Sequence, residues 1–188
     1  VFTEDRTFLY DIDPDIAKWI IDSRTSINIG CISHNTIQSA GTDLLYCSRS
    51  GVHTVHRSED NGILVMSQSL SEKINALYRS FLVYVDNPET VSAIFDQDNK
   101  QYHIYFPVTG GITTQRLTLN FNTEANEGRI KWSTGTYLNV KCGAFYGGRL
   151  VVGTGGGAFN VDHPEDIKED SIAPEMTAVT PLLWLKDL

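Results

Sequence analysis

Basic residues are scarce in this chain. Its 188 residues include 15 Lys and Arg against 23 Asp and Glu, which gives a net charge of −8. Tight binding to DNA or RNA depends on clustered cations that replace the counterions around phosphates, so this composition argues against it. With 41% apolar residues the chain can bury a core of ordinary size, and we expect a single domain over residues 1–188. Because the chain starts at Val1 and stops inside the apolar run 182–185, we expect it to be a segment of a longer protein.

Cysteine pairs and long apolar runs are missing as well. Cys31, Cys47 and Cys142 stand far apart without a C-x-x-C pair, which supports neither a disulfide framework nor a zinc knuckle. No stretch approaches the roughly 18 to 20 apolar residues of a membrane span, and no charged and then apolar leader opens the chain. We therefore expect reduced, buried thiols in a soluble protein that is made in a reducing cytosol and has no membrane partner.

Patterns typical of catalytic or cofactor-binding sites are also lacking. The glycine-rich residues 153–157 have no following Lys-Ser/Thr and no following helix, so a hairpin turn explains them better than a phosphate-binding loop. His53 and His56 are three residues apart, so on an extended strand they face opposite sides and cannot share a metal. Asp96 and Asp98 lie at a turn without the closing Glu of a calcium loop. We predict no catalytic, cofactor-binding or metal-binding residues and no enzyme activity.

Alternation of apolar and polar residues is the strongest pattern that is present. It covers residues 91–95 and 102–106 on either side of the turn 98–100, and it returns at 117–121 and 130–132. Four short antiparallel strands joined by tight turns form one blade of a β-propeller. The chain is therefore predicted to be all-β, with about three to four antiparallel four-stranded blades of a propeller or of part of one.

Two segments of similar sequence support this prediction. Residues 44–55 resemble residues 150–161, which lie 106 positions later, and two blades of about 50 residues would produce this spacing. Each segment contains a turn glycine, Gly51 in the first and Gly157 in the second. We predict that both glycines occupy equivalent turn positions with backbone angles that β-branched residues resist.

One segment has the spacing of a helix instead of a strand. Its apolar residues recur three or four positions apart, at Leu70, Ile74, Leu77, Tyr78, Phe81 and Leu82. Ser69 and Glu72 match a capping box, which would start a helix. We predict one short amphipathic helix at about residues 70–82, with its apolar face packed on its own domain.

Three short stretches resemble a known family. Residues 30–33, 41–52 and 70–74 read as a G-C strand, a D-L-hydrophobic-S-x-x-G-V hairpin and an L-S-x-x-I helix start. This series is similar to the propeller region of the tail nozzle proteins of tailed bacteriophages, which are also called tail tubular or DNA-stabilisation proteins. Residues 91–106 and 149–161 fit the family more loosely. The chain departs from it in being much shorter than a nozzle subunit and in lacking a visible platform region.

The resemblance implies a structural protein of the virion tail that is made in the host bacterial cytoplasm. It implies a homohexameric ring below the head-to-tail adaptor, a mount for other tail proteins, and a channel through which DNA passes during ejection without tight binding. An acidic lining would repel phosphate. The candidates for that lining are Asp166, Glu169 and Asp170, in the acidic stretch 162–175, although a solvated loop would have the same composition.

A carbohydrate-binding or sialidase-like propeller is the alternative. Residues 48–54 resemble a degenerate Asp-box, the hairpin turn of sialidase-type propellers, with Ser50 at the position of the family's Asp. That box is structural even in enzymes. A glycosidase also needs paired carboxylates or an arginine cluster at the scissile bond, and the sequence gives no reason to bring such residues together.

Overall fold

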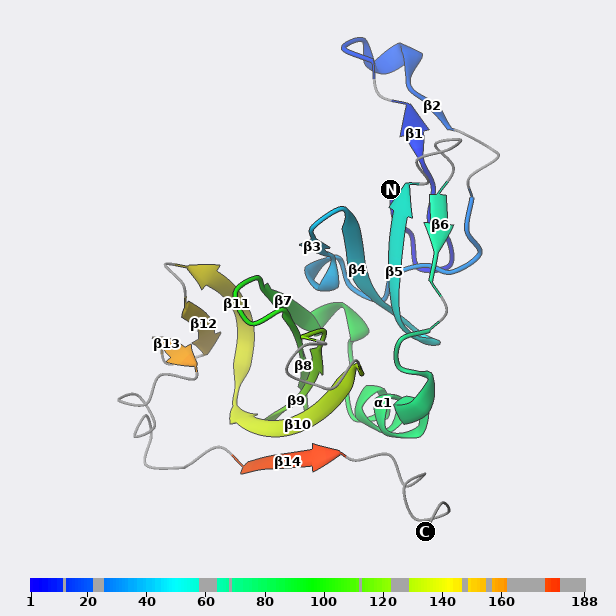
Figure 1. Cartoon of the computed structure of the whole chain (residues 1–188). Coiled ribbons are helices and arrows are strands. Elements are labelled where there is room, and N and C mark those ends of the chain that lie inside the picture. The colour runs from blue at the N-terminus through cyan, green and yellow to red at the C-terminus, as the bar shows by residue number, and fades with distance from the viewer. Residues whose placement is uncertain are drawn as a thin grey trace.

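The computed structural model of the chain is largely antiparallel β-sheet (Figure 1). It describes residues 1–11, 13–21, 26–57, 64–67, 69–111, 113–122, 129–146, 149–154, 157–161 and 175–179. The described part contains three larger sheets, one two-stranded ribbon, one α-helix and short 3₁₀ turns. The predicted all-β class is confirmed.

The first sheet has four strands in chain order. Its strands are β3 (Gln38–Ala40), β4 (Asp43–Ser48), β5 (Gly51–Arg57) and β6 (Leu64–Met66). Each strand pairs antiparallel with the next. A 3₁₀ turn, η3 (His34–Thr36), precedes the sheet, and Ser33 caps it by accepting a hydrogen bond from the backbone N–H of Asn35.

The central sheet contains the four strands that the alternation predicted. They are β7 (Ser92–Asp96), β8 (Gln101–Pro107), β9 (Thr113–Asn120) and β10 (Lys131–Leu138). A fifth strand, β14 (Glu175–Val179), pairs antiparallel with the outer edge of β10. A 3₁₀ turn, η5 (Pro88–Thr90), leads into β7, with Asn87 as its N-cap.

The third sheet follows directly on the central sheet. It has three strands, β11 (Val140–Tyr146), β12 (Arg149–Thr154) and β13 (Gly157–Val161). Strand pairing in β12–β13 matches that in β4–β5, because Leu150 is paired with Val161 as Leu44 is with Val55. The segments that lie 106 positions apart are thus hairpins of the same register.

The sheets are not the uniform four-stranded blades that the sequence predicts. Within the described part of the chain, the sheets contain two, three, four and five strands, and they do not close into a ring. The central sheet has a fifth strand because β14, a segment distant in sequence, pairs with β10. The third sheet has three described strands.

The central sheet is covered on both faces, which is why most residues of β7, β8 and β9 are buried. One face packs against the first sheet and the helix, through residues such as Tyr102, Ile104 and Phe106. The opposite face packs against the third sheet, and a Cβ atom at Gly143 would lie only 2.0 Å from Ile94 Cδ1. Figure 1 shows the third sheet on one side of the central sheet and the helix on the other.

The predicted helix is confirmed, with a start slightly later than expected. A 3₁₀ turn, η4 (Glu72–Ile74), runs into α1 (Asn75–Val83). Ile74 and Tyr78 are buried, and the helix packs on the chain's own core. The predicted capping box is wrong, because Ser71 is the N-cap of η4 and no side chain caps the turn. The hydroxyl of Ser71 makes a tertiary contact instead, because its Oγ accepts a hydrogen bond from the Val52 backbone N–H at 3.0 Å.

Candidate functional site

The turn between β4 and β5 is held by one serine and needs a glycine. Ser48 Oγ accepts hydrogen bonds from the backbone N–H groups of Ser50 and Gly51, at 3.0 and 3.1 Å. Gly51 has a φ of +147°, and a Cβ atom there would lie 2.4 Å from the hydroxyl oxygens of both Ser69 and Ser71. Strain and steric overlap therefore both exclude larger residues at Gly51.

Gly157 stands at the same place in its own hairpin. It is the first residue of β13 and the Cα partner of Thr154, as Gly51 is the first residue of β5 and the partner of Ser48. The predicted channel residues Asp166, Glu169 and Asp170 lie outside the described residues. Their assignment to a channel lining stays a prediction.

A polar groove of about 500 Å³ lies beside the β4–β5 turn. Its lining includes Glu4, His34, Arg49 and Glu89. Arg49 is ion-paired with Glu4 across the groove, and Ser33 Oγ donates a 2.8 Å hydrogen bond to the Glu89 carbonyl. These contacts join the N-terminal segment and η5 to the first sheet, so the polar groups of the groove hold loops together.

Two of the three thiols are unsuited to nucleophilic chemistry. Cys31 and Cys47 are buried and free, as predicted. Burial raises the pKa of Cys47 from 9.0 to about 12, and burial also raises the pKa of Cys31, so both stay protonated at neutral pH. The prediction of a buried thiol is wrong for Cys142, which is exposed next to a shift in the register between β11 and β12.

The buried histidines are held neutral. His53 Nε2 lies 3.1 Å from Ser50 Oγ, and burial lowers the pKa of His53. His103 Nδ1 lies 3.0 Å from Thr118 Oγ1. Burial and the charge of Arg116 lower the pKa of His103 from 6.5 to about 3. At neutral pH the imidazole of His103 is therefore a hydrogen-bonding group and not a cation.

Arg116 is a buried charge that sequence reasoning missed. It is 2% exposed, and its guanidinium carbon lies 4.7 Å from the centre of the Tyr137 ring, a cation–π contact. Its Nε and Nη1 atoms have no hydrogen-bond partner among the described residues. The alternation of β9 indicates on which face of the strand Arg116 lies, because Arg116 and Thr118 occupy the face opposite Leu117 and Leu119.

The described part of the chain offers neither a metal site nor a membrane-spanning helix. No group of three or more His, Cys, Asp or Glu side chains among the described residues is placed to hold a metal ion. None of the described helices is long and apolar enough to cross a membrane.

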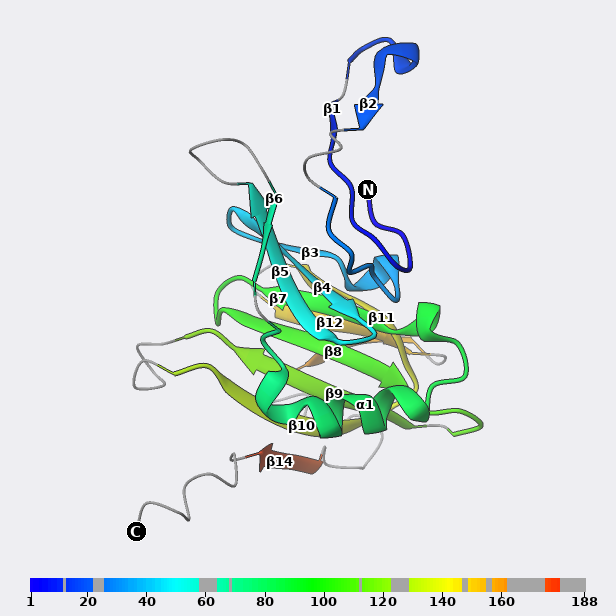
Figure 2. The same cartoon turned by 90° about the vertical axis from the view of Figure 1, so that its right-hand side faces the viewer.

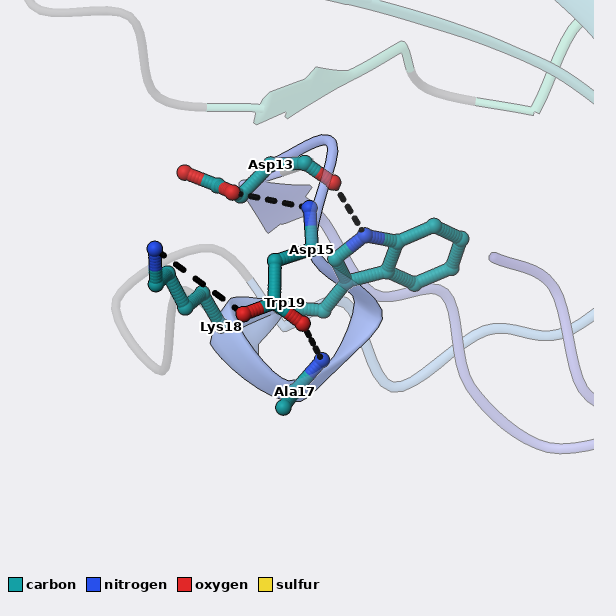
Figure 3. Close-up of polar contacts among 5 residues, drawn as sticks. All are labelled: Asp13, Asp15, Ala17, Lys18 and Trp19. Carbon is teal, nitrogen blue, oxygen red and sulfur yellow. Dashed lines mark hydrogen bonds and ion pairs between the residues drawn. The ribbon is translucent and has the colours of Figure 1, made fainter.

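The ribbon at the N-terminal end forms an arm that stands away from the sheets (Figures 1 and 2). We define the arm as β1 (Tyr10–Asp11), η1 (Ile16–Lys18) and β2 (Ile20–Ile21) with the connecting residues 13–15 and 19. Its tip is fixed by internal polar contacts (Figure 3). Trp19 Nε1 donates a 2.8 Å hydrogen bond to the Asp13 carbonyl, and Asp15 Oδ1 accepts one from the Ala17 N–H at 3.1 Å.

The arm presents apolar side chains to solvent. Large apolar residues there are exposed, at Ile16, Trp19, Ile20 and Ile21. No sequence pattern indicates this surface, because a short ribbon with a 3₁₀ tip matches neither a long alternating strand nor a helix. Projection from the body is a tertiary property that no local pattern predicts.

Comparisons of the chain with protein families, with curated proteins and with solved structures found no match.

Proposed function

We propose that this chain is a structural segment of a β-propeller in the tail nozzle of a tailed bacteriophage. In this proposal six copies form a ring below the head-to-tail adaptor, the ring encloses part of the DNA ejection channel, and other tail proteins mount on it. The protein is made in the host bacterial cytoplasm and resides in the virion tail. It has no catalytic role and needs no cofactor.

The observation that carries the propeller assignment is the order in which the sheets stack. The first, central and third sheets follow one another along the chain and pack face to face. The first strands of the three sheets are also neighbours in space: β3 contacts β7, and β7 contacts β11. In a propeller the blades pack in this way around a central channel, with the first strand of each blade innermost.

The matching hairpins agree with this arrangement. Hairpins β4–β5 and β12–β13 have the same register, and the central sheet separates them along the chain. Three consecutive blades would place the hairpins two blades apart, as the spacing of 106 residues requires.

Chemistry and charge support a structural role. The imidazole of His103 and the thiol of Cys47 are held in their neutral forms inside the core, where they serve packing and hydrogen bonding. The net charge of −8 suits a channel through which DNA slides, because a negative surface repels phosphate. The acidic stretch 162–175 remains the predicted lining.

A carbohydrate-binding propeller is the second candidate, and the groove beside Arg49 is the observation that favours it. Its lining contains the carboxylates of Glu4 and Glu89 and the charged Arg49, which are groups that bond to sugar hydroxyls. Light scattering and a glycan array separate the two proposals. A tail component is expected to assemble into oligomers and to retain no glycan. A monomer that binds a defined glycan, and loses it on Arg49→Ala, would contradict the tail proposal.

A further inference from the structure

The arm is an exposed apolar surface that the described sheets and helix do not cover. Ile16 is 75% exposed and Trp19 is 43% exposed, and neither belongs to the hydrophobic clusters of the described residues. Among the described residues, neither β1 nor β2 pairs with a further strand. An isolated two-stranded ribbon is at best marginally stable in water, so contact with a further surface would stabilise this one.

The tip of the arm is preorganised for such a contact. Its polar groups bond to one another and to the backbone (Figure 3), whereas the large apolar side chains of the arm are exposed. Asp15 accepts from the Ala17 N–H and lies 3.9 Å from Lys18 Nζ. A tip that is already ordered loses little entropy on binding, and Trp is among the residues that contribute most at interfaces.

A complementary surface lies at the other end of the molecule, on α1. Ala76, Arg79 and Val83 are exposed and share one face of the helix, because their spacing is three and then four residues. Val83 is 80% exposed, and the neighbouring Tyr84 is 60% exposed. This face is apolar with one basic residue, whereas the tip of the arm carries two acidic residues, Asp13 and Asp15, and one basic residue, Lys18, which gives the tip a net charge of −1. The two surfaces match in both polarity and charge.

The arm cannot reach the helix of its own chain. Figures 1 and 2 show the arm and α1 at opposite ends of the molecule in both views. We propose that the arm of one copy docks on the exposed face of α1 and Tyr84 in a second copy of this chain. The inference rests on the proposed homo-oligomer and names its contact surface.

A contact between two different surfaces of identical copies has a consequence for assembly. Each copy offers one arm and one helix, so the contact is heterologous and joins copies head to tail. Such contacts form a ring when the rotation closes and a filament when it does not. In a ring every copy gives one arm and receives one, and each is therefore held on two sides.

Cross-linking of a mixture tests the contact directly. Cys142 is exposed and is first replaced by Ser. In this background, protein carrying Ile16→Cys is mixed with protein carrying Val83→Cys and treated with a short bismaleimide. We expect dimers in at least five-fold excess over a control mixture in which Leu44→Cys replaces Val83→Cys. Leu44 is an exposed apolar residue of the first sheet. Equal yields in the two mixtures would overturn the docking of the arm on α1.

Further variants show whether a negative result contradicts only the arm contact or also the proposed function. Trp19→Ser is expected to reduce the oligomer to monomer in light scattering without change in the melting temperature, because Trp19 lies outside the core. Arg79→Glu is expected to lower the cross-link yield several-fold, whereas Lys131→Glu, an equal charge change at an exposed site of β10, leaves it unchanged. An unaltered oligomer in Trp19→Ser would overturn the arm contact while leaving the homo-oligomer intact. A wild-type chain that stays monomeric at all concentrations would overturn both.

Discussion

The hydroxyl of Tyr78 donates a 2.7 Å hydrogen bond to the backbone carbonyl of Ser48, and it thereby joins helix α1 to the β4–β5 turn. Both residues are buried, and Ser48 also holds the turn through its side chain. The helix, the turn and the first sheet therefore form one unit.

Removal of this hydroxyl should destabilise the fold measurably. Tyr78→Phe keeps the ring, which packs edge-on against Phe106, but leaves the Ser48 carbonyl without this donor. We expect a loss of about 1 to 3 kcal/mol in the free energy of unfolding, measured by urea denaturation. Tyr84→Phe, at an exposed position next to the same helix, should change the stability by less than about 0.5 kcal/mol. Equal effects of the two changes would show that the Tyr78 bond does not stabilise this joint.

Gly51 should tolerate no β-branched residue. Gly51→Val introduces a Cβ atom that overlaps the hydroxyls of Ser69 and Ser71 at a positive φ, and we expect a cost of more than about 1 kcal/mol. Gly111→Ala is the control, since a Cβ atom there would make only ordinary contacts at 3.5 Å. The melting temperature should fall for the first variant and hardly change for the second. An unchanged melting temperature for Gly51→Val would contradict the turn geometry and the alignment of the two hairpins.

Acid should weaken the fold through His103. Its pKa is about 3 in the folded chain and 6.5 in the unfolded chain, so between these values the unfolded chain binds a proton that the folded chain does not. The stabilisation from neutral His103 is complete above pH 6.5 and is lost as the pH falls toward 3, by up to about 1.4 kcal/mol per pH unit. In pH-dependent denaturation His103→Gln should flatten this slope, whereas the exposed His34→Gln should not. Identical slopes for wild type and His103→Gln would exclude this linkage.

Duplex DNA should bind weakly. The chain has eight more acidic than basic side chains, so few counterions are released when it meets phosphates. We expect a Kd weaker than about micromolar at physiological salt in fluorescence anisotropy. Tighter binding by the wild-type chain would contradict a channel that repels DNA.

The strands and the helix were predictable because their patterns are local. Strands β7 to β10 alternate because the face toward the first sheet and the helix is apolar, whereas the opposite face also carries buried polar residues such as His103 and Thr118. Helix α1 buries one face around Tyr78. The pairing of β14 with β10 was not predictable, because the strand joins a partner about forty residues away and has no distinctive pattern of its own. Local patterns also misassigned Ser69 as a helix cap, since its hydroxyl contacts Ser71 at 3.2 Å instead. The burial of Arg116 has no local signature, because charged residues usually lie at the surface and its cation–π partner Tyr137 comes from the neighbouring strand β10.

The central claim is that three consecutive sheets of this chain belong to a propeller in a phage tail ring. Under the proposed function, the most direct test is a cryo-electron microscopy reconstruction of the phage tails in which this chain would reside. We predict density for the first, central and third sheets in each of six subunits below the head-to-tail adaptor, with β3, β7 and β11 innermost in their blades. Virions that contain no copy of the chain, or a ring in which these three strands lie at the outer rim, would contradict the account.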